Sequence, residues 1–157
     1  MPPALWFFDN LVRVHVSSDD SDGRASVIEV HAGPGDMPPL HIHRVDDEVF
    51  HLLSGAMTFY IGERELQVAA GEAAFTPSGV PHTYRVESAQ GATWLVFTPS
   101  GQFASFVDAV ARPAKAEELP PHAEGPPSPE EAAELSELAA EYDIEILGPP
   151  GMLPSEL

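Results

Sequence analysis

Short segments in which apolar and polar residues alternate, separated by turn residues, constrain the fold of this chain more than any other feature. In residues 12–16 the valines alternate with Arg13 and His15, a period of two that is typical of a half-buried β-strand. The 157 residues include 17 Pro and 12 Gly, which favours many turns over a helical bundle. Eight similar segments follow, at residues 26–31, 41–44, 48–53, 57–61, 65–69, 73–76, 82–86 and 93–98. These nine strands predict an all-β antiparallel sandwich or barrel.

The apolar spacing changes after the last strand and divides the chain near residue 112. Apolar residues recur at helical spacing over 101–112, which predicts a short amphipathic helix: Phe103, Phe106, Val107 and Val110. Residues 113–127 are a linker rich in Pro, Ala and Glu, without periodicity. We therefore expect a β-barrel with its short helix over 1–112, the linker over 113–127, and a C-terminal helix and tail over 128–157.

The segment 128–157 opens with a strong helix-start signal. Ser128 suits the N-cap, Pro129 the first helical position, and Glu131 completes a capping box. One face of this helix carries an apolar stripe, formed by Leu135, Leu138, Ala139 and Tyr142. The many acidic residues here permit two interpretations, a regulatory or docking arm and a solvated face whose apolar stripe packs on the barrel. We expect the second.

Charge and composition exclude several classes of protein. With 25 acidic and 7 basic residues the net charge is −18, which disfavours binding to nucleic acid and to membrane surfaces. There is no cysteine, so disulfides, thiolate nucleophiles, iron–sulfur clusters and Cys-based zinc sites are excluded. The N-terminal residues lack the basic region of a signal peptide, and no apolar run approaches the ~18 residues of a membrane span. We expect a cytoplasmic protein with no nucleic-acid or membrane partner.

Three histidines and one glutamate form the strongest candidate for a functional site. His41 and His43 are two residues apart on a predicted strand, so their side chains share a face. Glu48 begins the next strand, and His82 follows a Pro-Ser-Gly turn. Three imidazoles and one carboxylate suit a divalent transition metal with open positions, without choosing among Fe, Ni, Co, Mn, Cu and Zn. A single strand histidine is more often a hydrogen-bonded core or surface residue, so the prediction depends on the set of four.

The other four histidines are not expected at this site. His51 has the opposite parity to Glu48 and should face outward. His15 and His31 lie on the early strands and His122 lies in the linker, where a surface or interface position is the simplest assignment.

The spacing around the candidate ligands resembles the two sequence motifs of the cupin superfamily. The first motif, G-x5-H-x-H-x4-E-x6-G, is matched at every anchor by Gly35, His41, His43, Glu48 and Gly55. The second, G-x5-P-x-G-x2-H, is matched by Gly71, Pro77, Gly79 and His82. Val86 stands where the second motif usually ends in Asn, which is not one of the family's metal ligands. The short segment between the motifs resembles that of small single-domain bacterial cupins.

The resemblance implies a double-stranded β-helix, or jelly-roll barrel, with C-terminal helices. In a cupin barrel the two motifs lie on facing strands, so the three histidines and Glu48 would converge on one metal ion inside. Parity with Glu48 or His82, and a second apolar face on the strand at 57–61, make five residues candidates for the wall of a substrate pocket: Phe50, Leu52, Met57, Phe59 and Tyr84. Such residues are more often plain core than substrate contacts.

Within the superfamily, the chain most resembles quercetin 2,3-dioxygenase-like monocupins. The similarity covers Pro-x-His-x-His-x3-Asp-Glu at 39–48, Pro-x-Gly-x-Pro-His at 77–82, Thr-Pro-x-Gly at 98–101 and the tail at 141–150. In such enzymes the metal binds a flavonol oxygen, and O2 cleaves the heterocyclic ring with release of carbon monoxide. The resemblance therefore implies a small aromatic substrate and O2 as partners. It also makes Glu48 the catalytic base, its basicity raised by a desolvated position.

Fold does not determine function, and three hypotheses stay open. The first is a metal-dependent dioxygenase for a flavonol or a related enolisable aromatic compound. The second is a non-oxidative metalloenzyme, an isomerase or polyketide-type cyclase that uses the metal as a Lewis acid. The third is a metal or small-molecule binding module without turnover, which the presence of all four ligand residues argues against. Dependence on O2 separates the first hypothesis from the second.

The N-terminal run at residues 4–8, Ala-Leu-Trp-Phe-Phe, is too hydrophobic for a free terminus. It either packs on its own barrel or forms an interface between chains. Cupins of this size commonly form homodimers through N-terminal strands, so we expect a homodimer.

Overall fold

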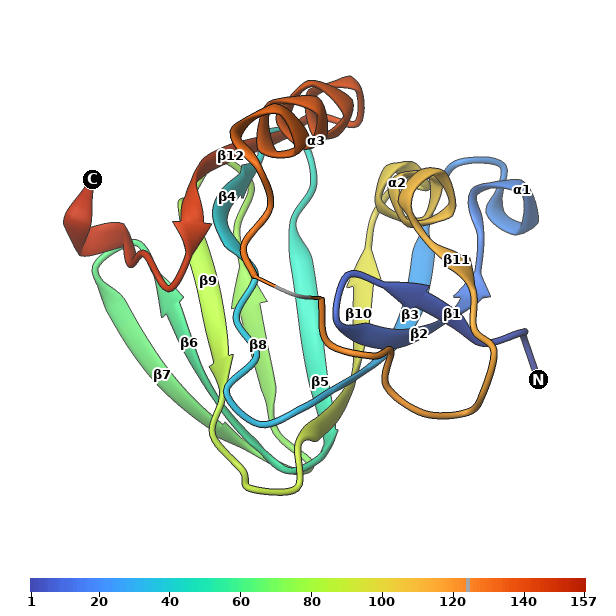
Figure 1. Cartoon of the computed structure of the whole chain (residues 1–157), viewed down its shortest axis with the longest axis horizontal. Helices are drawn as coiled ribbons and strands as arrows, with labels where there is room; N and C mark the ends of the chain where they lie inside the picture. The colour runs from blue at the N-terminus through green and yellow to red at the C-terminus, as the bar shows by residue number, and fades with distance from the viewer. Residues whose placement is uncertain (124) are drawn as a thin grey trace.

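The computed structural model describes residues 1–123 and 125–157, and its framework is two antiparallel β-sheets that face each other (Figure 1). One sheet has the strand order β11-β1-β2-β3-β10-β5-β8, and the other has the order β12-β4-β9-β6-β7. This arrangement confirms the predicted jelly-roll class, as two facing sheets rather than a closed barrel.

All nine predicted strands are present, with bounds that differ from the expected ones by no more than a few residues. They are β2 (Asn10–Val16), β3 (Ser26–Ala32), β4 (Pro39–His43), β5 (Glu48–Ser54), β6 (Ala56–Ile61), β7 (Arg64–Ala69), β8 (Ala73–Thr76), β9 (His82–Val86) and β10 (Ala92–Thr98). In β3 every second residue from Ser26 to Ala32 is buried, as the period of two requires. The inner faces form one apolar core, in which Phe59 and Trp94 are each 1% exposed.

The N-terminal apolar run packs within its own chain. It forms β1 (Leu5–Phe7), which pairs with β2 and with β11 (Arg112–Pro113). Trp6 is buried as a result. The homodimer and the domain boundaries stay predictions. A short helix, α1 (Ser18–Ser21), lies in the connection between β2 and β3, because Ser17 and Asp20 form a capping box there.

Two longer helices lie near one end of the two sheets (Figure 1). Helix α2 (Gln102–Val110) falls inside the predicted range, and α3 (Pro129–Glu141) begins with the predicted capping box. The Ser128 hydroxyl accepts from the Glu131 N–H at 3.2 Å, and the Glu131 carboxylate accepts from the Ser128 N–H at 2.7 Å. No helix in the described part of the chain is long and apolar enough to cross a membrane.

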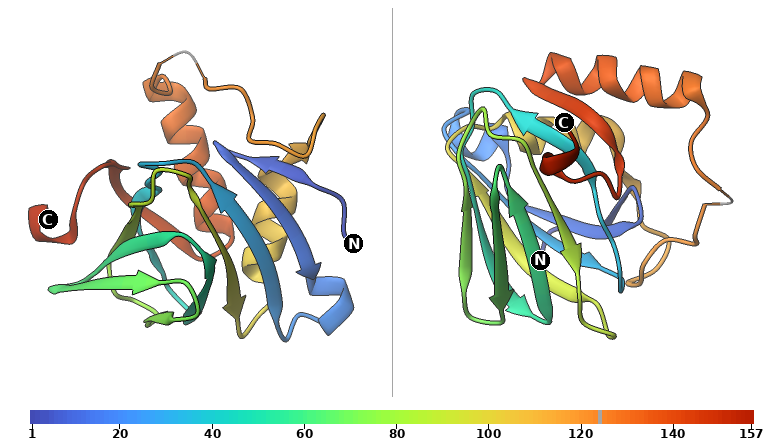
Figure 2. Two further views of the ribbon diagram at one scale, coloured as in Figure 1. Left: turned by 90° about the horizontal axis from the view of Figure 1, so that it is seen from below. Right: turned by 90° about the vertical axis from the view of Figure 1, so that its left-hand side faces the viewer.

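The tail after α3 is a sheet strand, which was not predicted. Strand β12 (Ile144–Pro150) pairs with β4, and Ile144 lies opposite His43 (Figure 2). A final 3-10 turn covers Pro154–Glu156. The predicted stripe of α3 packs with β12 and α2 in a second apolar cluster, whose buried members are Phe106, Ala139 and Ile144. The C-terminal segment is thus joined to the strand that carries two of the candidate ligands.

Candidate metal centre

Four side chains from three strands converge between the two sheets. His41 and His43 lie on β4, and His82 begins β9, which pairs with β4 so that His41 lies opposite His82. Glu48 begins β5 in the facing sheet. One nitrogen or carboxylate oxygen from each of the four lies within 4.8 Å of the others, and three of the residues are buried. The structure therefore brings together all four candidate ligands of the sequence analysis.

The turn between β8 and β9 positions His82 against β4. Gly79 has a φ of +77°, a conformation that costs glycine little and other residues more. Its N–H donates to the His43 carbonyl oxygen at 2.8 Å, which ties the turn directly to the ligand-bearing strand. The Pro-x-Gly motif thus has a mechanical function: it fixes the position at which β9 begins.

Backbone carbonyl groups orient two of the imidazole rings. Nδ1 of His41 lies 2.7 Å from the Pro39 oxygen, and Nδ1 of His82 lies 2.9 Å from the Val80 oxygen. A carbonyl oxygen only accepts, so in each ring Nδ1 carries the proton and the lone pair of Nε2 is free for a metal ion. Nε2 of His82 lies 3.0 Å from Glu48 Oε2. Two lone pairs at that distance repel each other unless a proton or a metal cation lies between them, so the donor set fits a metal ion.

Burial and mutual charge favour the protonation states that metal binding needs. Burial, followed by repulsion from His82 and His43, lowers the pKa of His41 to about 3. Burial also raises the pKa of Glu48, which is 2% exposed, but the charge interaction with His43 and the hydrogen bond from His82 outweigh burial and lower the pKa to about 2. A carboxylate beside neutral imidazoles is the ligand form of the site. The prediction that desolvation raises the basicity of Glu48 is therefore wrong for the metal-free protein, because the histidines reverse the effect of desolvation on its pKa.

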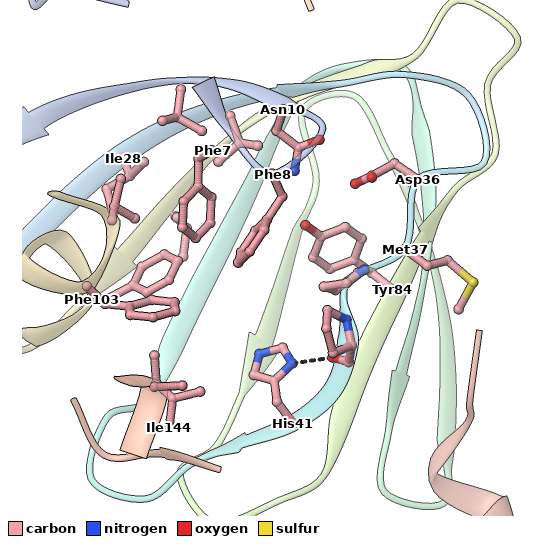
Figure 3. Close-up of a pocket in the computed structure, with 18 of the residues that line it drawn as sticks. Phe7, Phe8, Asn10, Ile28, Asp36, Met37, His41, Tyr84, Phe103 and Ile144 are labelled. Carbon is pink, nitrogen blue, oxygen red and sulfur yellow. Dashed lines mark hydrogen bonds between the residues drawn. The ribbon is translucent and has the colours of Figure 1, made fainter. Parts of the chain in front are cut away.

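An apolar cavity of about 270 Å³ opens beside His41, His43 and Glu48 (Figure 3). Of the five predicted wall residues, the structure places Phe50 and Tyr84 on its lining. The other three are buried in the core and are not part of that lining: Leu52, Met57 and Phe59.

Much of the cavity wall comes from residues that were not predicted to be there. Phe7 and Phe8 enter from the turn between β1 and β2, Phe103 from α2, and Ile144 from β12. The ring of Phe103 lies edge-on to His43, with centroids 5.6 Å apart. The apolar N-terminal run and the helical stripes predicted burial of such residues. Nothing in the local pattern shows that they converge on the same cavity as the histidines.

The comparison with known protein families gives the class of this chain. Residues 28–98 match the Cupin_2 family, described as a cupin domain. With the fold and the His/Glu cluster above, this match shows that residues 28–98 form a cupin domain.

Among curated proteins, the chain is similar to the quercetin 2,3-dioxygenase of Bacillus subtilis (strain 168), with 34% identity over 115 residues. The match covers 72% of this chain and 33% of that protein, so the chain spans about a third of its relative's length. Among solved structures, the polyketide cyclase RemF of Streptomyces resistomycificus is 27% identical with a TM-score of 0.52, covering 62% of this chain and 68% of that chain. A predicted oxalate decarboxylase of Thermotoga maritima shares the fold with a TM-score of 0.55 at 21% identity, covering 58% and 80%.

Proposed function

We propose that this cupin is a metal-dependent dioxygenase that uses O2 to cleave a ring of a flavonol or a related enolisable aromatic compound. The observation that carries the proposal is the position of the His/Glu cluster at the wall of a cavity lined mainly by apolar side chains. The similarity to a quercetin 2,3-dioxygenase supports the substrate class.

The residues of the cluster have separate roles in this proposal. His41, His43, His82 and Glu48 would hold one divalent ion. The chemistry that such an ion supplies when bound is Lewis-acid activation of a substrate oxygen, with O2 as the oxidant. Glu48 accepts the proton of the enolic hydroxyl, for which an oxygen of its carboxylate must face the substrate. Thr76 Oγ1 donates to Glu48 Oε2 at 3.2 Å, which fixes the carboxylate, whose Oε1 lies 3.3 Å from His43 Nε2.

The cavity wall positions the substrate and excludes water. Phe50 and Tyr84 flank one part of it with ring centroids 6.1 Å apart, and Phe103 covers His43. A volume of about 270 Å³ lies just below the roughly 300 Å³ at which small-molecule sites begin, so the cavity favours one compact, planar molecule. Aromatic side chains in edge-to-face contact suit an aromatic substrate in particular.

Oxygen consumption tests the proposal. The protein is stripped of metal, reconstituted separately with iron, manganese, cobalt, nickel, copper or zinc, and supplied with quercetin in an oxygen-electrode cell. Oxygen uptake that matches flavonol loss in at least one metal form, and is absent in His82→Ala, is the expected result. Stoichiometric metal binding without uptake in any form contradicts a flavonol dioxygenase.

A second candidate function is non-oxidative catalysis of the cyclase type. The similarity to the polyketide cyclase RemF, at 27% identity, supports it. The same cluster would then polarise a carbonyl group, with Glu48 moving a proton and no oxidant consumed. Turnover of an aromatic polyketide-like substrate at an equal rate with and without O2 would favour this alternative.

A further inference from the structure

The cavity has a second polar end, away from His41 (Figure 3). Asn10 at the start of β2 and Asp36 in the loop between β3 and β4 both line it. Asn10 is 7% exposed, and its Oδ1 is buried without a hydrogen-bond partner among the described residues. Oδ2 of Asp36 is likewise buried without a hydrogen-bond partner among the described residues. Both atoms are acceptors, and the side-chain hydrogen bond between Asn10 and Asp36 leaves them without a donor.

Strand β9 fixes the distance between this polar end and the metal centre. The Val86 N–H donates to the Asp36 carbonyl oxygen at 3.1 Å, and the Gly35 N–H donates to the Val86 oxygen at 2.9 Å. These bonds hold the loop at one end of β9, whose other end is His82. Four residues of extended chain span about 13 Å. The two polar ends of the cavity are therefore separated by roughly the length of a molecule with two or three fused or linked rings.

Tyr84 lies midway along β9 and connects the two ends. It has the same parity as His82, and its hydroxyl points into the cavity on the side of Asn10 (Figure 3). Burial raises the pKa of this hydroxyl well above its ordinary value, and the charges of Asp36 and Glu48 add to the effect. The ring packs against Trp94, with centroids 5.2 Å apart. Between the polar ends, the wall is thus an aromatic surface.

Leaving Asn10 Oδ1 and Asp36 Oδ2 without partners is unfavourable for the folded protein. Buried acceptors without donors lose their hydration and gain nothing in return. Burial raises the pKa of Asp36 to about 6, even though the side-chain hydrogen bond from Asn10 acts in the opposite direction, and Asp9 raises it further. A bound hydroxyl group at this position would donate one hydrogen bond and satisfy one of the two acceptors.

We propose that Asn10 and Asp36 form a second recognition point, which binds a hydroxyl group at the end of the substrate remote from the metal centre. The inference rests on the proposed function and narrows its substrate class. The substrate has an enolic hydroxyl at the metal centre and a phenolic hydroxyl at the far end, so it is a polyhydroxylated flavonol-like compound. Asn10 and Asp36 are specificity residues and take no part in the bond-breaking step.

The test compares two flavonols that share the enolic hydroxyl. Kaempferol carries further phenolic hydroxyls, including one on the remote ring, and 3-hydroxyflavone carries none. Binding to the zinc-loaded protein is measured by quenching of tryptophan fluorescence, because Trp94 lines the cavity. Zinc has no redox chemistry, so binding is observed without turnover.

The expected result is that kaempferol binds about 10- to 100-fold more tightly than 3-hydroxyflavone, the range for a hydrogen bond to a charged group. Asn10→Ala and Asp36→Ala reduce this ratio to about threefold or less, while the affinity for 3-hydroxyflavone changes little. Asp36→Asn retains part of the ratio because it keeps one acceptor oxygen. Asp108→Ala, a carboxylate removal on the exposed face of α2, leaves the ratio unchanged.

Two other outcomes separate the inference from the proposed function. If both flavonols bind the wild-type protein equally, or if the ratio survives in Asn10→Ala and Asp36→Ala, the recognition point is refuted and the flavonol site is retained. If the zinc-loaded protein binds neither flavonol, the proposed substrate class fails and the recognition point fails with it. Thermal unfolding of each variant verifies folding, and Asp36→Asn supplies an isosteric change if a truncation does not fold.

Discussion

The residues inside the cupin match and the residues outside it contribute different parts of the site. All four candidate ligands, together with Phe50 and Tyr84, lie within residues 28–98. The opposite wall of the cavity comes from outside that range, through Phe7 and Phe8, α2, α3 and β12. The two regions meet at two strand pairs, where β12 lies beside β4 and β2 lies beside β3.

The candidate ligands and much of the cavity wall therefore come from separate parts of the chain. The ligands are held by paired strands, a tight turn and backbone hydrogen bonds, and the pairing of β4 with β12 is the part of this support that involves a flanking segment. The cavity shape depends on aromatic and aliphatic side chains that those segments add. The similar proteins have different names, a quercetin dioxygenase and a polyketide cyclase. A ligand set that stays the same while the residues of the cavity wall vary is compatible with this difference.

The largest effect is expected from removing a ligand inside the cupin region. His82→Ala should lower zinc affinity by more than about a hundredfold, since even residues that only orient a ligand contribute 10- to 100-fold. His51→Ala, on β5 but outside the cluster, should bind one zinc per chain like the wild type. Isothermal titration gives both affinities. Equal zinc binding by the two variants would show that the ion is held elsewhere.

The next largest effect is expected from a substitution in the flanking region. It should lower the stability of the fold and leave metal binding unchanged. Ile144 is 4% exposed and lies opposite His43, so Ile144→Ala should lower the free energy of unfolding by about 2–4 kcal/mol. Flavonol affinity should fall as the wall recedes, while zinc stoichiometry stays at one. Leu157→Ala, at a residue that is 63% exposed, should stay within about 0.5 kcal/mol of the wild type. Loss of zinc from the folded Ile144→Ala variant would show that the two regions are not separable.

A pH-dependent effect is expected at Asp36. Its pKa is about 6 in the folded chain, against 3.8 for the unperturbed group, because burial and Asp9 outweigh the Asn10 amide. The folded state therefore binds the proton more tightly, and the carboxylate destabilises it as pH rises from about 4 towards and above 6. In metal-free protein, Asp36→Asn should raise the free energy of unfolding by about 1–2 kcal/mol at pH 7.5.

Near pH 4 the gain from Asp36→Asn should be absent, because the carboxyl group is then protonated in the folded state. Urea unfolding at the two pH values gives the comparison, with Asp22→Asn as an exposed control. A variant that is less stable than the wild type at pH 7.5 would show that Asp36 supports the fold rather than the substrate.

The smallest effect on the free energy of unfolding is expected from a substitution at the start of α3. This substitution should leave zinc affinity unchanged. Ser128→Ala removes the capping box and should cost about 1 kcal/mol. Ser136→Ala, in the interior of the same helix, should be neutral or stabilise by a few tenths of a kcal/mol, because Ala has the higher helix propensity. Chemical denaturation measures both. A change in zinc affinity in either variant would contradict the separation of the two regions.

The sequence predicts the cupin region well because its signals are local. Alternation along single strands predicts β2 to β10, and the fixed spacing of His41, His43, Glu48 and His82 predicts the ligand set. The capping box at Ser128 likewise depends on residues three apart. The strand and capping patterns are contained within a few neighbouring residues, and the four ligands fall in two short motifs, so no knowledge of the tertiary structure is needed.

The cavity and the added strands could not be predicted in the same way. β12 contains Gly148, Pro149 and Pro150, which disfavour a strand by propensity, and it forms because β4 offers an open edge. Parity correctly marks Leu52 as inward-facing, but it does not show whether an inward residue meets core or cavity. Asn10 and Asp36 have no motif around them. Their importance arises from burial without a partner, which only the folded chain shows.

The central claim is that one metal ion is held by His41, His43, His82 and Glu48 beside the apolar cavity. An anomalous difference map from crystals of the zinc-loaded protein tests it most directly. The expected result is one strong peak per chain, roughly 2.0–2.2 Å from the three Nε2 atoms and from a Glu48 oxygen. A peak among the carboxylates of the acidic C-terminal segment, with none between the three histidines, would contradict the account.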